Sequence, residues 1–190
     1  MKKFDIKIER TNTTSSPLPK GAYVCKILKA EQKDYSWGSR LEISFDVSEG
    51  EYKDHFKTAY LADTRENKKW KGVYRLTIPD ETKQNYDSQA RTFSNAIATI
   101  EESNNGYHWD WNEATLKDKT VGVLIREFEY DIEGRTGWST EAFALITPEE
   151  VRAGKFKDPQ PRPLKNKPAA NPLESGFIAD VKNLEDQLPF

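Results

Sequence analysis

Residues that build cross-links and metal centres are nearly missing from this sequence. Its 190 residues include one cysteine, Cys25, and two histidines. A lone cysteine excludes an internal disulfide framework and fits a reducing compartment. One Cys and two His are also too few for a Cys/His zinc site within one chain. We therefore expect no metal and no other cofactor, and we expect Cys25 to be a buried apolar residue rather than a nucleophile.

Long hydrophobic runs are absent as well. No segment approaches the roughly 20 apolar residues of a membrane-spanning helix, which excludes a protein that spans the membrane in this way. The opening residues, Met1-Lys2-Lys3-Phe4-Asp5, lack the apolar region of a secretory signal. The sequence thus predicts a cytoplasmic protein without membrane contact.

The whole chain has no large excess of positive or negative charge, but its segments do. The net charge is -2, from 29 basic and 31 acidic residues. Residues 1–154 hold 23 basic and 26 acidic residues, residues 155–170 hold five and one, and residues 171–190 hold one and four. A basic segment followed by an acidic one indicates a division of roles.

Proline marks the boundary between these parts. Five of the ten prolines fall within residues 159–172, where they prevent a helix or a central strand and favour extended geometry. We predict a folded domain over residues 1–154 and a Pro-rich basic linker over 155–176. Residues 177–190 are too poor in apolar residues to form a core, which predicts a disordered acidic tail that becomes ordered on a partner.

The domain reads mainly as strands. Arg40 to Val47 alternates, with Leu41, Ile43, Phe45 and Val47 on one face and Arg40, Glu42, Ser44 and Asp46 on the other. The other strand candidates are Tyr23–Ala30, His55–Leu61, a short extra one over Val73–Ile78, and a hairpin of Thr120–Tyr130 with Trp138–Ile146.

Two helices interrupt the strands. Ala90, Phe93, Ile97 and Ile100 recur at helical spacing, and Asn105-Gly106 ends that helix. Thr147-Pro148-Glu149-Glu150 has the capping residues of a second, short helix. Three strands, a helix and two strands follow the order of a five-stranded OB-fold barrel with its helix between strands 3 and 4. An open antiparallel sheet with one covering helix gives a similar order.

Aromatic and basic residues alternate where an OB barrel binds its ligand, on strands 2 and 3 and in the loops joining strands 1–2 and 4–5. Such a mixture suits single-stranded nucleic acid, because bases stack on rings and phosphates need cations. Trp37 and Trp70 are the foremost stacking candidates. The predicted DNA-binding residues are Lys33, Tyr35, Trp37, Arg40, Lys57, Tyr60, Lys69, Trp70, Lys71, Tyr74, Arg135 and Trp138.

Two features limit this interpretation. Tyr107, Trp109 and Trp111 follow the helix and are expected to cap the barrel rather than to bind a strand. Glu42 and Asp46 share the expected outer face of one strand, so a phosphate-binding groove must be local or assembled by a homo-oligomer.

The last residues form the most specific signal. The chain ends Leu184-Glu185-Asp186-Gln187-Leu188-Pro189-Phe190. A terminal Phe190 presents a ring and a carboxylate to one pocket, Leu188 adds a second apolar anchor, and Pro189 lowers the entropy lost on docking. Glu185 and Asp186 steer the tip toward a basic surface. The predicted partner-binding residues are therefore Glu185, Asp186, Leu188, Pro189 and Phe190.

This ending resembles the acidic tip of bacterial single-stranded-DNA-binding proteins, although Gln187 stands where an acid is usual. The body resembles a family of phage-encoded proteins with a single-strand-binding OB fold. The resembling segments are Leu18-Pro19-Lys20-Gly21-Ala22-Tyr23, Glu49-Gly50-Glu51-Tyr52-Lys53, Ser103-Asn104-Asn105-Gly106-Tyr107 and Trp109-Asp110-Trp111. The resemblance implies a protein of phage replication or recombination that coats single strands in the bacterial cytoplasm. Its tip would recruit helicases, polymerases or nucleases.

Two other classes remain open. Asp46 with Glu51-Tyr52-Lys53 imitates the signature of a magnesium-dependent nuclease. Otherwise the sequence has no phosphate loop and no nucleophile elbow, and we expect a protein that is not an enzyme. The second class is a protein-interaction module whose tip acts as a decoy for host factors.

Overall fold

The computed structural model describes residues 16–164. It contains the strands β1 (Gly21–Tyr35), β2 (Gly38–Val47), β3 (Val73–Thr77), β4 (Thr120–Ile132) and β5 (Arg135–Ile146). The helices are α1 (His55–Ala62), α2 (Tyr86–Glu102) and α3 (Pro148–Arg152), with a 3-10 turn over Glu113–Leu116. The terminal Leu-Pro-Phe tip, the acidic tail and most of the expected linker lie outside the described residues.

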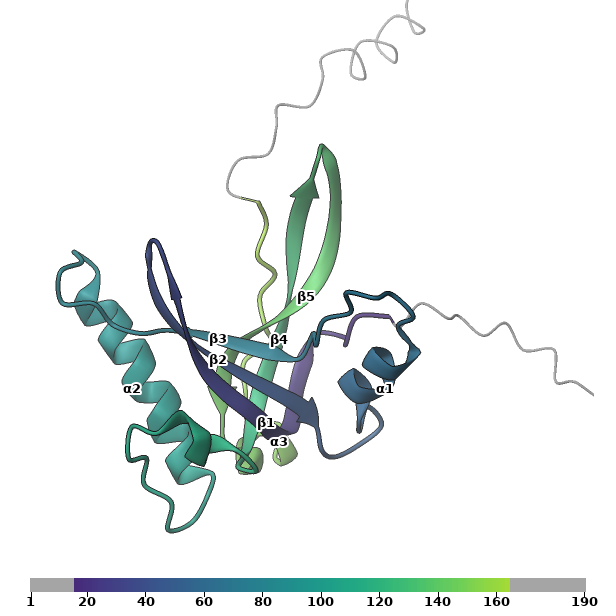
Figure 1. Cartoon of the computed structure of the whole chain (residues 1–190). Coiled ribbons are helices and arrows are strands. Elements are labelled where there is room, and N and C mark those ends of the chain that lie inside the picture. Colours follow the sequence, from purple (N-terminus) through teal and green to yellow (C-terminus); the bar gives the residue numbers. More distant parts are fainter. Residues whose placement is uncertain (1–15, 165–190) are drawn as a thin grey trace, which may run out of the picture.

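The five strands form one antiparallel sheet in the order β3-β2-β1-β4-β5. β1 is central because its second half pairs with β2 and its first half with β4. The β1–β2 and β4–β5 hairpins extend beyond the sheet on the same side, with α2 and α1 on either flank (Figure 1). The prediction of a mainly β fold with one long helix between strands 3 and 4 is confirmed.

The sheet curves until its two edge strands approach each other. Cα atoms of β3 and β5 come within 8 Å, but no ladder of hydrogen bonds joins the two strands. The structure is therefore a strongly curved sheet, and the closed barrel of the sequence prediction is not formed in it.

The segment His55–Leu61 is helical, so its prediction as the third strand is wrong. Phe56 and Tyr60 lie four residues apart, a spacing that also places them on one face of a helix. The third strand is Val73–Thr77, which the sequence indicated only as a short extra strand. The helix starts against Asp46, a residue of β2, whose carboxylate accepts hydrogen bonds from the backbone N–H groups of Phe56 and Lys57 at 2.9 and 3.0 Å.

Asp46 itself contradicts the expectation that it faces solvent. Its side chain also accepts from the N–H of Val47, and the residue is only 6 % exposed. A buried carboxylate needs such donors, because an unpaired one would lose its hydration without compensation. Asp46 therefore holds α1 against the end of β2.

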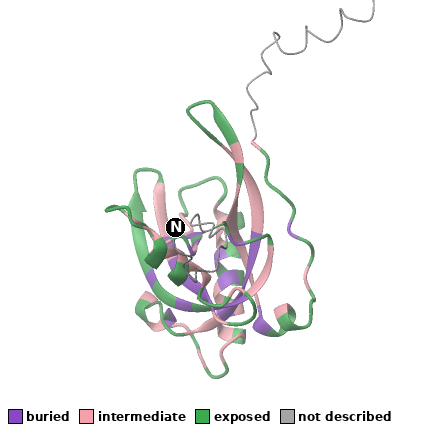
Figure 2. Cartoon of the chain, turned by 90° about the vertical axis from the view of Figure 1, so that its right-hand side faces the viewer, coloured by how far each residue is buried: buried purple, intermediate pink, exposed green. Residues whose placement is uncertain are grey.

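The core lies between the sheet and α2. The apolar face predicted for β2 is confirmed, since Leu41, Ile43, Phe45 and Val47 are all buried. From α2, Phe93, Ala96 and Ile100 pack against it. Cys25 is fully buried, as expected, and burial raises the pKa of its thiol. Buried residues concentrate at the base of the sheet, and the hairpin tips are exposed (Figure 2).

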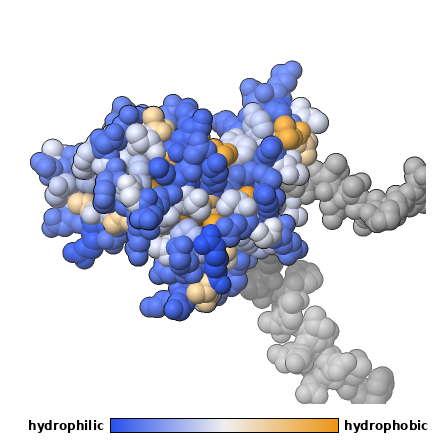
Figure 3. Space-filling model, turned by 90° about the horizontal axis from the view of Figure 1, so that it is seen from below, coloured by the Kyte–Doolittle hydropathy of each residue, from blue (hydrophilic) through white to orange (hydrophobic). Residues whose placement is uncertain are grey.

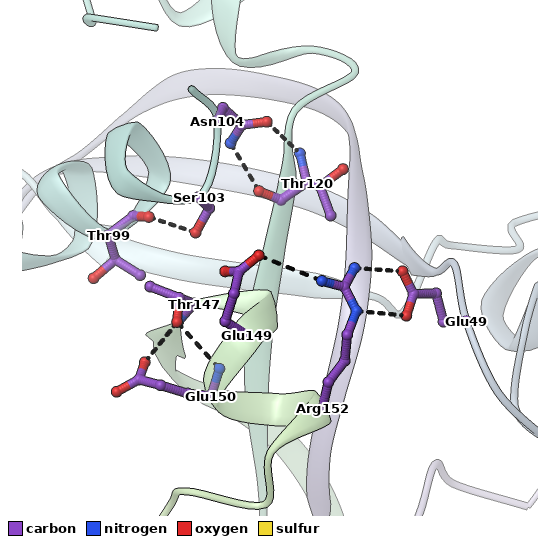
Figure 4. A network of polar contacts seen from close by, with 9 residues as sticks. All are labelled: Glu49, Thr99, Ser103, Asn104, Thr120, Thr147, Glu149, Glu150 and Arg152. Carbon is purple, nitrogen blue, oxygen red and sulfur yellow. Dashed lines mark hydrogen bonds and ion pairs between the residues drawn. The ribbon is translucent and has the colours of Figure 1, made fainter. Parts of the chain in front are cut away.

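The short helix α3 closes the base in the manner the sequence predicts. Thr147 and Glu150 form a reciprocal capping box, with Pro148 in the first turn. Arg152 then donates two hydrogen bonds, of 2.7 and 3.1 Å, to Glu49 in the turn after β2 (Figure 4). The surface on this side is mostly hydrophilic with small apolar patches (Figure 3).

Residues 155–164, which we call the strap, lie against the body although the sequence assigns them to the linker. Pro159 is fully buried. Arg162 exchanges backbone hydrogen bonds of 2.9 Å with Glu127 and Glu129, along the free edge of β4. Its guanidinium binds Glu141 at 2.9 Å. The described body thus extends to residue 164.

Candidate nucleic-acid interface

The tip of the β1–β2 hairpin carries a stack of two rings and one guanidinium. The rings of Tyr35 and Trp37 lie nearly parallel, at 11° with centroids 5.2 Å apart. The guanidinium carbon of Arg40 lies 4.3 Å from the Trp37 ring centroid and 5.8 Å from that of Tyr35. Trp37 is 46 % exposed. We call Tyr35, Trp37 and Arg40 the hairpin stack.

Local geometry explains why the stack forms there. Only Ser36 and Trp37 separate β1 from β2, so the turn is tight. Gly38 follows at a φ of 143°, a backbone conformation that other residues rarely adopt. The turn leaves the Trp37 ring outside the core, where a stacked Tyr35 and an overlying cation support it.

Glu42 organises the cations behind the stack. Its carboxylate accepts from Lys33 at 2.8 Å and from the Tyr35 hydroxyl at 3.1 Å, and Arg75 of β3 lies at 3.5 Å. The hydrogen bond from Lys33 is the main cause that lowers the Glu42 pKa, so this carboxylate stays ionised. Glu42 therefore positions cations on the outer face, where the sequence suggested only repulsion of phosphate.

The β4–β5 hairpin is organised differently. Trp138 is 51 % exposed and stands opposite Glu129 across the hairpin. Alternation places Glu127 and Asp131 on the same face as Trp138 and puts Arg135 on the opposite face. The two residues predicted to bind DNA from this loop, Arg135 and Trp138, are thus not brought together.

Some of the predicted DNA-binding residues around α1 pack in the interior of the fold, and others lie on its surface. The Trp70 indole N–H donates to the carbonyl oxygens of Phe45 and Gly72, both at 3.1 Å. Gly72 must be glycine, because a Cβ there would lie 2.4 Å from the Phe45 carbonyl oxygen. Trp70 is therefore a partly buried structural residue, whereas the sequence interpretation made it a foremost stacking candidate.

Four further predicted residues lie on α1, on β3 or in the segment between them. Tyr60 packs on Trp70 and has the Lys68 ammonium 4.6 Å from its ring centroid. Lys57 and Lys69 are exposed. Tyr74 is only 5 % exposed and belongs to the core, so its prediction as a DNA-binding surface residue is wrong. Burial raises the pKa of its hydroxyl. Its strand points it inward, as Leu76 two residues later.

A cleft of about 270 Å³ opens between β3 and β5. Lys71 and Arg75 lie on its β3 side and Ser139 and Thr140 on its β5 side, with His55 of α1 nearby. Burial lowers the pKa of His55 below its ordinary value. We call this the β3–β5 cleft. Of its polar residues, the sequence prediction included only Lys71, because the others come together through curvature of the sheet.

The aromatic residues after α2 separate into two groups. Tyr107 and Trp109 pack against the core, as expected. Trp111 is 78 % exposed; its ring is stacked on Phe93 and tilted against Trp109, and it does not cap the sheet. Its φ of 65° turns it outward. The prediction for Trp111 is therefore wrong.

Two observations bear on other kinds of site. Within residues 16–164, no three His, Cys, Asp or Glu side chains gather where they could hold a metal ion. The carboxylate of Asp46, the acid of the nuclease-like pattern, is occupied by three backbone N–H groups. In the same part of the chain, no helix has the length and apolar content needed to cross a membrane.

Comparison with known proteins adds no assignment. No protein family and no curated protein matches the chain.

Proposed function

We propose that the protein is a non-catalytic single-stranded-DNA-binding protein of the OB type that acts in phage replication or recombination. The hairpin stack carries this proposal. It presents two parallel rings on which bases can stack, with a cation above them and two more cations held by Glu42. Stacking of this kind tolerates any base, and contributes roughly 1–3 kcal/mol per base.

The strand order supports an OB-type barrel. β3 and β5 are the two ends of the sheet and lie beside each other, and α2 lies between β3 and β4 in the chain. A partly open five-stranded Greek-key barrel has these features, and its ligands bind at strands 2 and 3 and at the two hairpin loops. The hairpin stack lies at one of these loops.

Because the chain has a net negative charge, only a local group of cations can attract the DNA. The whole sequence carries -2, so attraction of the strand depends on Lys33, Arg40 and Arg75. Three phosphate contacts would give a slope of about -2 for the logarithm of the binding constant against the logarithm of salt concentration. Such a groove suits cooperative coating or a homo-oligomer.

The test is a titration of labelled oligo-dT, oligo-rU and duplex DNA with the full chain, at about 50 and 200 mM salt. We expect salt-dependent binding of the single strands, and intact products on a gel when Mg²⁺ is present. Absence of single-strand affinity would overturn the proposal and favour the protein-interaction module. Cutting that requires Mg²⁺ would favour the nuclease.

Recruitment through the tip is proposed from the sequence. Deleting residues 177–190 is expected to leave DNA affinity unchanged or higher and to abolish the capture of replication proteins. Loss of DNA affinity in this deletion would contradict the division of roles.

A further inference from the structure

The β3–β5 cleft has walls of two kinds. Phe45, from the core side, and Phe56, from α1, give it an apolar lining. Lys71 and Arg75 are cations on one side, and Ser139 and Thr140 are hydroxyl residues on the other. At about 270 Å³ it is slightly smaller than the roughly 300–1,000 Å³ of small-molecule sites. It therefore suits a flat heterocycle better than a larger ligand.

Four polar residues of the cleft have side chains that are free to bind. Within residues 16–164, the side chains of Lys71, Ser139, Thr140 and His55 make no hydrogen bond or ion pair, and the His55 ring contacts only Tyr52 and Phe56 edge-on. All four residues line the cleft; Lys71 is exposed, and no polar side-chain atom of the other three, which are half-buried, is a buried atom without a partner. Polar groups that converge unpaired on an apolar pocket are the usual mark of a ligand site.

The acid in the cleft does not oppose an anion. Glu141 lines the cleft, but Arg126 and Arg162 bind its carboxylate at 2.8 and 2.9 Å. The remaining charge in the lining is that of Lys71 and Arg75. Arg75 also approaches Glu42 at 3.5 Å, which connects the cleft to the cations behind the hairpin stack.

We propose that the β3–β5 cleft takes one unstacked nucleobase of the bound single strand. This inference rests on the proposed function and extends it. The base stacks against Phe56, its edge meets the hydroxyls of Ser139 and Thr140, and the neighbouring phosphates meet Lys71 and Arg75. The strand thus runs from the hairpin stack along β3 into the cleft, with one base leaving the row of stacked bases.

The experiment is an abasic scan with the full chain. The shortest oligo-dT that binds with full affinity is prepared with one abasic site at each position in turn. Affinity is measured by fluorescence anisotropy. We expect a loss of about 5-fold or more at one position for the cleft and at one or two others for the hairpin stack, in keeping with the contribution of stacked bases.

Two variants assign these positions. Ala59→Phe fills the cleft from α1, and Thr58→Phe, on the exposed side of the same helix, is its control. A59F should bind the intact oligonucleotide several-fold more weakly and lose its sensitivity to the cleft position alone. T58F should keep the wild-type profile. Thermal unfolding shows whether both variants remain folded. If A59F does not fold, a flat abasic profile of the wild type still overturns the proposal.

Each outcome decides the proposal separately from the proposed function. Tight binding with a flat abasic profile, or a profile that A59F leaves unchanged, overturns the cleft proposal and leaves strand binding intact. No binding of any oligonucleotide overturns the proposed function itself. A position that becomes sensitive only after removal of residues 1–15, where Phe4, Ile6 and Ile8 alternate with polar residues, would show that the chain's own N-terminal segment occupies the cleft.

Discussion

The two long hairpins of the molecule have similar backbones but carry different side chains around their exposed tryptophans. Each joins two long strands through a two-residue turn and exposes a tryptophan near its tip. In the β1–β2 hairpin, Trp37 stacks on Tyr35 under the Arg40 guanidinium. In the β4–β5 hairpin, Trp138 lies opposite Glu129 and on the same face as Glu127 and Asp131.

The difference shows that an exposed ring is not by itself a binding site for a polyanion. A base stacked on Trp138 would bring its phosphates toward acids, and the Coulomb energy would offset the stacking. A base stacked on Trp37 brings its phosphates toward cations that Glu42 already orients. We therefore expect the β1–β2 hairpin to anchor the single-stranded DNA. The β4–β5 hairpin contributes through Ser139 and Thr140, which line the β3–β5 cleft.

The largest expected difference between the hairpins is in stability, when an acidic residue far from each tip is replaced. Asp46→Ala at the end of β2 leaves one buried and two partly buried N–H groups without their acceptor, and we expect it to lower the free energy of unfolding by about 3 kcal/mol. Glu141→Ala in β5 removes partly exposed ion pairs and should cost less than about 1 kcal/mol. Urea unfolding measures both. Equal losses would show that Asp46 does not hold α1 in place.

The second difference concerns affinity for the strand. Trp37→Ala should weaken oligo-dT binding by about 2 kcal/mol, and Trp138→Ala by less than about 0.5 kcal/mol. Trp111→Ala, at a tryptophan beside α2 that is more exposed than either of these two, is the control and should bind like the wild type. Anisotropy titration at constant salt gives the three values. A larger loss in W138A than in W37A would reverse the comparison.

Much of the fold was readable because its patterns are local. The alternation of Leu41, Ile43, Phe45 and Val47 predicted β2 correctly, and helical spacing predicted α2. His55–Leu61 failed because Phe56 and Tyr60 fit both a strand and a helix, and Asp46, nine residues before His55, decides between them. A distant capping group leaves no local signal.

The candidate site was readable only at the hairpin tip. Tyr35, Trp37 and Arg40 lie within six residues, so their meeting follows from one tight turn. Trp70 was misjudged because its indole N–H donates to the carbonyl of Phe45, 25 residues earlier, which only the folded sheet brings near, as well as to that of Gly72, two residues later. The β3–β5 cleft joins residues more than 60 positions apart, and no spacing in the sequence indicates it.

The salt dependence of DNA binding should distinguish a cation beside the β1–β2 hairpin, Arg75 of β3, from a cation of the β4–β5 hairpin, Arg135. Arg75→Gln removes a cation at the cleft and is expected to reduce the salt slope by about 0.7, the value for one phosphate contact of a single strand. Arg135→Gln, on the far face of the β4–β5 hairpin from Trp138, should leave the slope unchanged. Titrations between about 50 and 200 mM salt measure both slopes. Equal slopes for R75Q and the wild type would remove Arg75 from the path of the strand.

The smallest expected effect is a pH dependence that arises at the cleft. Burial, with a smaller contribution from Lys71, holds the pKa of His55 below its ordinary value, and the charge of Asp46 offsets this in part. The unfolded chain, with a histidine pKa of about 6.5, therefore binds more protons than the folded one as the pH falls below that value. The stability that the neutral imidazole contributes is complete above about pH 6.5 and declines from there down to the folded pKa.

His55→Gln should remove this decline, and His108→Gln, at the other and exposed histidine, should keep it. Urea unfolding at pH 7.5, 6.5 and 5.5 compares the variants with the wild type. If H55Q lost stability with falling pH as steeply as the wild type, the decline would come from groups outside the cleft. If H108Q alone removed it, the exposed histidine would be its source, and α1 would carry no pH-sensitive contact with the cleft.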